Sequence, residues 1–273
     1  MQEYKVDGHV SSFLPEGKKW KLVWNDEFDK TELDTTKWYF RRHLFGEEHK
    51  AYIENAISFD GNSNIIFHLV EKDGKYYSST IQTGENFVDR PNGESRNVEP
   101  KFMHKYGYYE VRCILQKEAP WWSAFWLQSQ NNAFLDDPKE AGVEIDIMES
   151  FTPNTYIPHC CHWGGYGENY RFAHTGEREG HVGYDDEIHV TPGVYHTFAV
   201  DWDKTGYTFY VDGKQCGRKI DGPVSDTEQF ILLFTECFGY RKGAPYVKQT
   251  EFESGIKDEF IVDYVRVFDE VED

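Results

Sequence analysis

Three carboxylic acids lie within one short apolar run of this sequence. Glu144, Asp146 and Glu149 are separated by isoleucine and methionine in the stretch EIDIME. Side chains alternate between the two faces of a β-strand, so Glu144 and Asp146 share one face and the isoleucines share the other. Glu149 is out of step, because strict alternation would bury it among aliphatic side chains, where an unpaired carboxylate is costly. One extra residue near Ile147, inserted as a β-bulge, would return Glu149 to the face of Glu144.

Acids arranged in this way could break a glycosidic bond. With the bulge, the Cα atoms of Glu144 and Glu149 lie four strand steps, or about 13 Å, apart. Side chains leaning toward each other then leave about 5 Å between the two carboxyl groups, the separation of a retaining glycosidase. Three acids this close cannot all ionise freely, so at least one is expected to have a raised pKa and to stay protonated, as a general acid must. The alternatives are a solvated strand face and a cation site, although no 12-residue calcium-binding loop of DxDxDG type is present.

The elements that would position these acids are strands. Aromatic residues make up 17% of the 273 residues, and Gly, Asn and Asp turn signals recur about every ten residues, which favours many short strands. Strands are predicted at 64–70, 76–82, 107–115, 122–128, 143–149, 159–164, 196–201, 207–211, 230–234 and 261–268. With no internal repeat and no linker, they predict an all-β fold, a sandwich or jelly roll of two stacked sheets, in a single domain over residues 20–273. Residues 1–19 are polar and turn-rich and are expected to form a loose leader.

The charge balance restricts the partners. The chain has 48 acidic and 29 basic residues, a formal charge of −19, which disfavours nucleic acid and an anionic membrane surface. Its five cysteines show no CxxC spacing, so neither a disulfide framework nor a zinc site is predicted, and most are expected to be small core residues. No apolar run is long enough for membrane insertion, and the first residues lack a signal-peptide core.

Several stretches together resemble glycoside hydrolase family 16. The stretch EIDIME looks like the family's ExDxxE signature, in the bulged form of laminarinase-type and agarase-type members. Before it, WKLVWNDEF, YGYYEVR and WSAFWL resemble the family's opening segment and the two strands that precede the acids. After it, YHTFAVDW, FYVDG and VDYVRVF resemble the closing strands. The resemblance covers residues 20 to 269.

This resemblance implies a jelly roll of two curved antiparallel sheets, like that of concanavalin A, with an open cleft for a polysaccharide. It also implies an endo-acting hydrolase that retains configuration and requires no cofactor for catalysis. Glu144 would be the nucleophile and Glu149 the general acid/base, while Asp146 between them would tune their protonation.

Aromatic and imidazole side chains are expected beside the acids. In the family, tryptophans at the positions of Trp122 and Trp126 line the cleft, where flat rings stack on sugar faces. His162 and Trp163 lie on the strand after the acids and could reach the site, His162 by hydrogen bonding to the middle acid or to a hydroxyl. Ordinary core tryptophans and a structural histidine are the alternatives.

The substrate is less well defined by the sequence. Arg171 could contribute to a specific anion pocket. Where laminarinase-like members carry a Gly-Gly-rich strand, this chain has FILLFTEC, which places Glu236 near a cleft rim. A β-1,3- or mixed-linked β-1,3-1,4-glucan is therefore the default substrate, and an agarase- or porphyranase-like galactanase is the rival within the class. A lectin-like carbohydrate-binding protein without catalysis is the alternative from another class.

The resemblance also bears on metal, assembly and location. Family members often hold one structural Ca²⁺ on the convex side, and Glu27, Gly61 and Asp263 match its ligand positions. The alternative is that these two acids pair with nearby lysines or water. The expected partner is a polysaccharide, met by a monomer that is secreted, periplasmic or at the cell surface, its export signal already removed.

Overall fold

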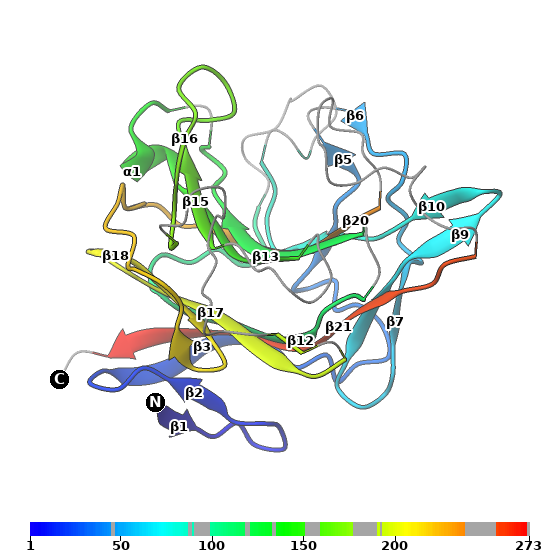
Figure 1. Cartoon of the computed structure of the whole chain (residues 1–273), viewed down its shortest axis with the longest axis horizontal. Helices are drawn as coiled ribbons and strands as arrows, with labels where there is room; N and C mark the ends of the chain where they lie inside the picture. The colour runs from blue at the N-terminus through cyan, green and yellow to red at the C-terminus, as the bar shows by residue number, and fades with distance from the viewer. Residues whose placement is uncertain are drawn as a thin grey trace.

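Two stacked antiparallel sheets form the body of the protein (Figure 1). The computed structural model describes residues 1–44, 47–86, 89, 99–117, 121–132, 135–150, 159–176, 190–191, 193–237 and 255–271. Within this described part the α-helix α1 (Pro138–Ala141) is a single turn that begins at the capping residue Asp137, and no helix is long and apolar enough to cross a membrane. The all-β expectation is confirmed.

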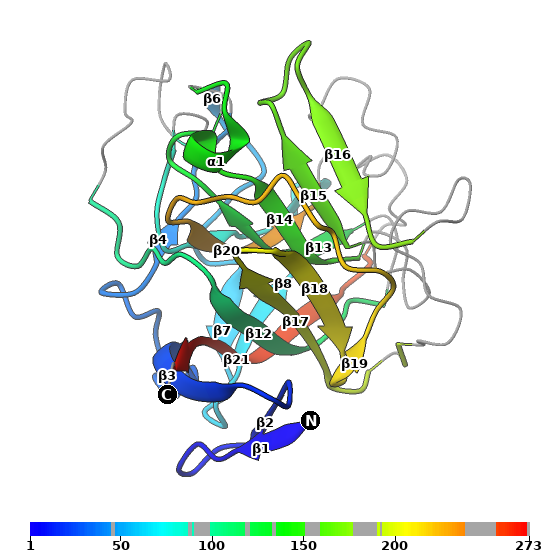
Figure 2. The same cartoon turned by 90° about the vertical axis from the view of Figure 1, so that its left-hand side faces the viewer.

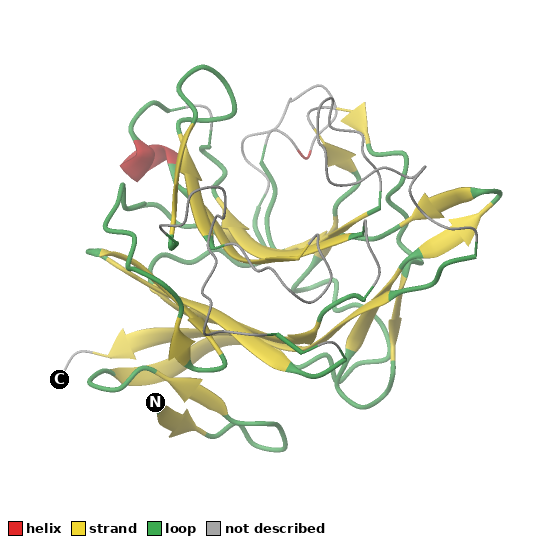
Figure 3. Ribbon diagram, viewed as in Figure 1, coloured by secondary structure: helices red, strands yellow, loops and turns green. Residues whose placement is uncertain are grey.

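The seven-stranded sheet carries the three acids. Its spatial order is β16-β15-β14-β13-β20-β11-β4, so strands far apart in the sequence are neighbours. In that order the strands span Arg171–His174, Cys160–Trp163, Glu144–Ser150, Trp122–Gln128, Phe230–Glu236, Ile81–Gln82 and Tyr39–Phe40. The sheet is curved, with β16 and α1 at one end and the hairpin of β5 (His43–Leu44) and β6 (Glu47–Glu48) at the other (Figures 1 and 3).

The second sheet lies beneath the convex side of the first (Figure 2). Its order is β19-β18-β17-β12-β21-β8-β7, and β3 also pairs with the long strand β21. These strands span Lys214–Gln215, Gly206–Val211, His196–Asp203, Gly107–Ile114, Glu259–Val271, Ile65–His68, Ile57–Phe59 and, for β3, Lys19–Asp26. All ten predicted strands are present, but the run at 76–82 is divided between β11 and β10 (Lys75–Tyr77), which forms a hairpin with β9 (Val70–Lys72).

The main hydrophobic core lies between the two sheets. Strand alternation explains its composition, because each strand of the seven-stranded sheet turns one set of side chains toward the second sheet. From β14 this set is Ile145, Ile147 and Met148, all fully buried. All five cysteines are buried free thiols, as the sequence predicts.

The first 19 residues are not a loose leader, so that prediction is wrong. Strands β1 (Gln2–Tyr4) and β2 (Ser12–Leu14) form a hairpin on the outer side of the second sheet (Figure 1). Leu14 is fully buried beside Tyr108 and Phe268. The guanidinium of Arg266, itself fully buried, donates from Nη1 to the carbonyl of Val10 (2.7 Å) and to Ser12 Oγ (2.8 Å). The polar composition gave no sign of this hairpin, because the groups that hold it, Arg266 and the apolar cluster around Phe268, lie far away in the sequence.

Candidate active site

The register of β14 against β13 contains the predicted bulge. Asp146 pairs with Trp126 and Glu149 with Ala124, so three steps along β14 match two steps along β13. Ile147 is the extra residue, and it lies in the core together with Met148. Two consecutive inward side chains return Glu149 to the opposite face.

The three acids therefore share the concave face of the seven-stranded sheet. Asp146 is buried, whereas Glu144 and Glu149 are half-buried. The same face carries Cys160, which pairs with Asp146 across β15. Burial first, and then the charges of Glu149 and Asp146, raise the pKa of the Cys160 thiol far above its ordinary value. The thiol therefore stays protonated beside the acids.

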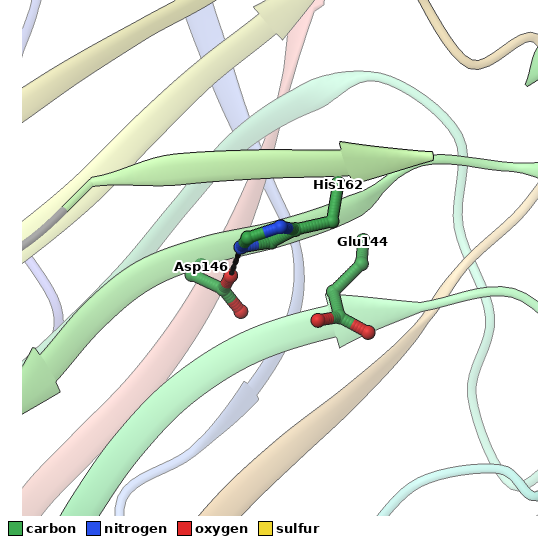
Figure 4. Close-up of side chains that lie close together, drawn as sticks. All are labelled: Glu144, Asp146 and His162. Atoms are coloured by element: carbon green, nitrogen blue, oxygen red, sulfur yellow. Dashed lines mark ion pairs between the residues drawn. The ribbon is translucent and has the colours of Figure 1, made fainter. Parts of the chain in front are cut away.

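His162 forms an ion pair with the middle acid. It pairs with Glu144 across the strands, and its Nε2 lies 2.9 Å from Asp146 Oδ2 (Figure 4). Burial lowers the pKa of His162, but the hydrogen bond and charge of Asp146, with the charges of Glu144 and Glu149, outweigh it and raise the pKa to about 9. The imidazole is therefore protonated at neutral pH. Its Nδ1 lies 2.6 Å from the hydroxyl of Tyr170, whose ring stacks on it, so two contacts fix the ring.

Glu144 is held by two donors that the sequence analysis did not identify. Gln128 Nε2 donates to Glu144 Oε2 at 2.7 Å, and the hydroxyl of Tyr166 donates to the same oxygen. Gln128 also donates to the Tyr166 hydroxyl at 2.6 Å, and Asn132 does so at 3.2 Å. Alternation along β13 could have indicated that Gln128 faces the acids, because it lies two residues after Trp126 and therefore on the same face of the strand. No comparable signal marks Tyr166, which lies in the turn after β15.

The two cleft tryptophans lie on the predicted face but differ in exposure. Trp122 is half-buried and meets the ring of Phe234 edge-on, with centroids 5.1 Å apart. Trp126 is only 8% exposed, because Phe234 and the guanidinium of Arg41 pack against its ring. Trp122 is therefore the more accessible of the two rings, and contact of either tryptophan with a sugar stays a prediction.

Trp163 and Arg171 lie on the other face of the sheet. They pair with each other across β15 and β16, and His162, the neighbour of Trp163, is on the face of Glu144. Trp163 packs against the main core, and the exposed Arg171 donates to the carbonyls of Glu168 and Tyr170. Strand parity thus excludes both from the group around the acids.

Glu236 also departs from its predicted place at a rim. It pairs with Trp122 across β20 and β13, but its side chain is only 2% exposed. Oε1 lies 3.8 Å from Nε2 of His49, which stacks on Tyr52 with centroids 3.7 Å apart. Direct contact of Glu236 with a bound sugar is not supported.

The residues expected to bind Ca²⁺ do not fit that ion. Both oxygens of Glu27 accept from Arg266, at 2.9 and 2.7 Å, and Asp263 accepts from Arg112. Gly61 lies in the neighbouring 60–64 turn with a positive φ of 74°. A hard cation requires carboxylate oxygens, and here each carboxylate is already neutralised by a guanidinium. The alternative of ion pairing holds, with arginine in place of lysine.

Glu144, Asp146 and His162 form a second group with possible metal ligands. One ligand atom from each lies within 4.8 Å of the others. A metal needs neutral imidazole, however, and the pKa of His162 is raised to about 9. The arrangement fits a hydrogen-bonded acid cluster better than a metal centre.

Comparisons with known proteins identify the family of this chain. The model of a family described as "Beta-porphyranase A-D, GH16 domain" matches residues 20–270. A glucan endo-1,3-beta-glucosidase A1 from Niallia circulans is 26% identical over 91% of the chain, which spans 38% of the length of that enzyme. Beta-porphyranase D from Zobellia galactanivorans is 32% identical over 50% of the chain and 31% of its own length.

The fold is shared with a solved structure. The catalytic domain of a laminarinase from Thermotoga petrophila superposes with a TM-score of 0.66 at 21% identity, covering 93% of this chain and 100% of that domain. The jelly roll expected from the sequence is confirmed. From the family match over residues 20–270, the chain belongs to glycoside hydrolase family 16, whose members are retaining endo-acting hydrolases that need no cofactor, and within it to the GH16 domains of the β-porphyranases A–D.

Proposed function

We propose that this chain is an endo-β-glycanase in which Glu144 is the nucleophile and Glu149 the general acid/base. The observation that carries this proposal is the bulge at Ile147, which sets Glu144, Asp146 and Glu149 on one concave face. A separation of about 5 Å between the two glutamate carboxyl groups, as retention requires, stays a prediction.

The reaction would proceed in two displacements. A carboxylate oxygen of Glu144 attacks the anomeric carbon and the glycosidic C–O bond breaks, while Glu149 donates its proton to the leaving oxygen. Glu149 then removes a proton from water, which attacks the same carbon and breaks the ester to Glu144. The hydrogen bonds from Gln128 and Tyr166 to Oε2 hold the nucleophile in one orientation throughout.

The protonated His162 supports this division of roles. Its charge compensates that of Asp146, at 2.9 Å, which lies between the two glutamates along the strand. Neutralising the middle acid reduces the repulsion that Glu144 would feel as a carboxylate. We propose that Asp146 and His162 act as a unit that sets the protonation of both glutamates.

We propose a β-linked galactan as the substrate, cut where its sugars are uncharged. The match to the β-porphyranase family model over residues 20–270 supports a galactan. The chain's charge of −19 argues against a polyanionic stretch in the cleft. Arg41, the basic group against Trp126, is 3% exposed and lies 2.6 Å from Asp89, so its charge is compensated within the protein.

A β-1,3- or mixed-linked glucan is the second candidate. It is favoured by the similarity to the endo-1,3-beta-glucosidase A1 over 91% of the chain. A polymer of either kind is too large to enter a cell, so we also propose that the protein acts outside the membrane, as a secreted, periplasmic or cell-surface monomer.

Release of reducing ends from agarose, porphyran, laminarin and lichenan tests these proposals. We expect agarose to be cut faster than native porphyran, and porphyran treated to remove sulfate to approach agarose. Activity on laminarin or lichenan alone would replace the galactan by the glucan. A Glu144→Gln variant should lose turnover and still bind oligosaccharide. If the wild-type protein binds oligosaccharide and releases no product from any polymer, it is lectin-like and the enzymatic proposal fails.

A further inference from the structure

A cavity of about 410 Å³ is lined in part by Tyr166, whose hydroxyl donates to Glu144. Its lining comes from the turn that joins β15 to β16 and from the segment around the start of α1, and both segments lie at the same end of the seven-stranded sheet (Figures 1 and 2). Its lining includes Leu135, Asp136, Trp163, Tyr166, Glu168 and Asn169. This volume falls within the range of about 300–1,000 Å³ typical of small-ligand pockets.

The chemistry of the lining suits an uncharged sugar. Trp163 and the 41% exposed Tyr166 supply aromatic rings, which pack on the C–H faces of a pyranose. Asp136 and Glu168 supply carboxylates and Asn169 an amide, which can hydrogen bond to hydroxyl groups. None of the lining residues that the structure describes is basic and two are acidic, so the lining itself disfavours a sulfate or carboxylate group.

Tyr166 joins this cavity to the nucleophile. Its ring belongs to the lining, and its hydroxyl donates to Glu144 Oε2. The turn that carries it is sterically restricted, because Gly164 has a φ of 77° and a Cβ at that position would lie 2.1 Å from the carbonyl oxygen of Asn169. Trp163, on the opposite face from His162, is fixed by the core. Two of the walls are therefore set before a ligand binds, which lowers the entropic cost of binding.

We propose that this cavity is a distal subsite that receives an uncharged sugar unit of the chain being cleaved. The inference rests on the proposed endo-glycanase function and extends it. Strand parity excludes Trp163 from the group around the acids, and the subsite gives it a contact with sugar outside that group. Binding there would press on the ring of Tyr166, whose hydroxyl orients Glu144.

The test compares cleavage of neutral oligosaccharides of two to eight units, prepared from whichever polysaccharide the wild-type enzyme cuts. The variant is Asp136→Ala/Glu168→Ala, in which two exposed acids of the lining are removed. The matched control, Glu32→Ala/Asp221→Ala, removes two exposed acids elsewhere. We expect kcat/KM of the lining variant to fall at least 10-fold for the longer oligosaccharides and to equal that of the wild type for the shortest one that is cleaved. The control variant should match the wild type at every length.

The outcomes separate the subsite from the function. A loss that is equal at all lengths, or no loss at any length, in an otherwise active enzyme overturns the subsite and leaves the glycanase intact. A wild-type enzyme that cleaves none of the four polysaccharides overturns the proposed function and the subsite with it. A Leu135→Ala variant, which removes an exposed apolar contact and no charge, should show the same dependence on length. If it does not, while the acid variant does, the effect is electrostatic and the subsite is rejected.

Discussion

The orientation of one carboxylate by two donors is the main residue-scale feature of this site. Both Tyr166 and Gln128 donate to Oε2 of Glu144, and Gln128 also donates to Tyr166, so the three side chains form a closed triangle. Hydrogen bonds to a charged group stabilise by about 1.5–3 kcal/mol. Losing one of them should therefore change the rate of the chemical step more than the binding of substrate.

A Tyr166→Phe variant tests this triangle. It retains the ring and removes only the hydroxyl. We expect kcat to fall about 10- to 100-fold with little change in KM, because the lost hydrogen bond orients a reacting group. Tyr77→Phe, a hydroxyl deletion on the β9–β10 hairpin, serves as the control and should leave both constants unchanged. An unchanged kcat for Tyr166→Phe, or a change confined to KM, would contradict the positioning role.

His162 makes the unfolding free energy of the protein depend on pH. The pKa of His162 is raised to about 9, so its protonated form is favoured by folding. This stabilisation is fully present below the unfolded pKa of about 6.5 and is lost as pH rises through the folded pKa. Across that window the wild-type protein should lose about 2–3 kcal/mol of unfolding free energy from this group.

Urea unfolding at pH 6, 7.5 and 9 measures this loss. A His162→Gln variant retains a side-chain donor but does not titrate, so its unfolding free energy should change less with pH than that of the wild type. The difference between the two proteins isolates His162 from other titrating groups. Parallel pH profiles for the two would show that the Asp146 ion pair does not stabilise the protonated imidazole.

Residue types and strand parity predicted part of this site. Glu144, Asp146, Trp122 and His162 follow from alternation along their own strands, and Glu149 follows from the cost of burying it, which required a bulge. The face of Trp163 was not predictable, because its parity becomes clear only once His162 is known to face Glu144, and its contact with sugar stays a prediction. Tyr166 was unpredictable, since a turn has no periodicity and its reach to Glu144 depends on three-dimensional contacts.

At the scale of the element, the bulge in β14 determines which acids can act together. The register shift lies between Phe125 and Trp126 on the neighbouring strand, and Ile147 and Met148 both enter the core. The sequence contained enough information to predict this, because an isolated carboxylate among aliphatic residues is so costly. The lengths of β10 and β11 were not predictable in the same way, since the break between them depends on long-range pairing with β20.

Changing the number of residues in β14 tests the role of the bulge. Deletion of Ile147 restores strict alternation with Glu149 still on the face of Glu144, so we expect reduced but measurable hydrolysis. Insertion of one alanine after Ile147 gives an even six strand steps between the two glutamates, about 20 Å, which is too far for both carboxyl groups to reach one glycosidic bond, so we expect none. Because removing a buried isoleucine costs about 2–5 kcal/mol, both variants should be assayed at low temperature after circular dichroism confirms folding. Equal loss of activity in two folded variants would show that the bulge does not control the site.

At the scale of the whole molecule, the catalytic acids and the stabilising N-terminal hairpin lie on opposite sides of the two-sheet sandwich. The register of β14 places the acids on the concave side, while the β1–β2 hairpin covers the outer side of the second sheet (Figure 1). That hairpin supplies two hydrogen bonds to the buried Arg266, which also pairs with Glu27. Its polar sequence gave no sign of this, because the contacts that order it come from residues about 250 positions away. The start of the catalytic domain at residue 20 stays a prediction. The prediction that residues 1–19 form a loose leader is wrong.

Removing residues 1–18 should separate stability from activity. Two lost hydrogen bonds to a charged group correspond to about 3–6 kcal/mol, which for a protein of this size lowers the melting temperature by about 10 °C or more. At temperatures where the shortened protein remains folded, kcat/KM should equal that of the full chain, because the hairpin is remote from the acids. An unchanged melting temperature, or a loss of activity without unfolding, would contradict this account.

The central claim is that Glu144 carries the sugar during turnover. Inactivation with a 2-deoxy-2-fluoro glycoside of the preferred substrate slows the second displacement, so that the glycosyl ester accumulates. Peptide mass spectrometry of the inactivated protein should then find the sugar on Glu144. A sugar on Glu149 or Asp146, or turnover that inverts the anomeric configuration without any adduct, would contradict it.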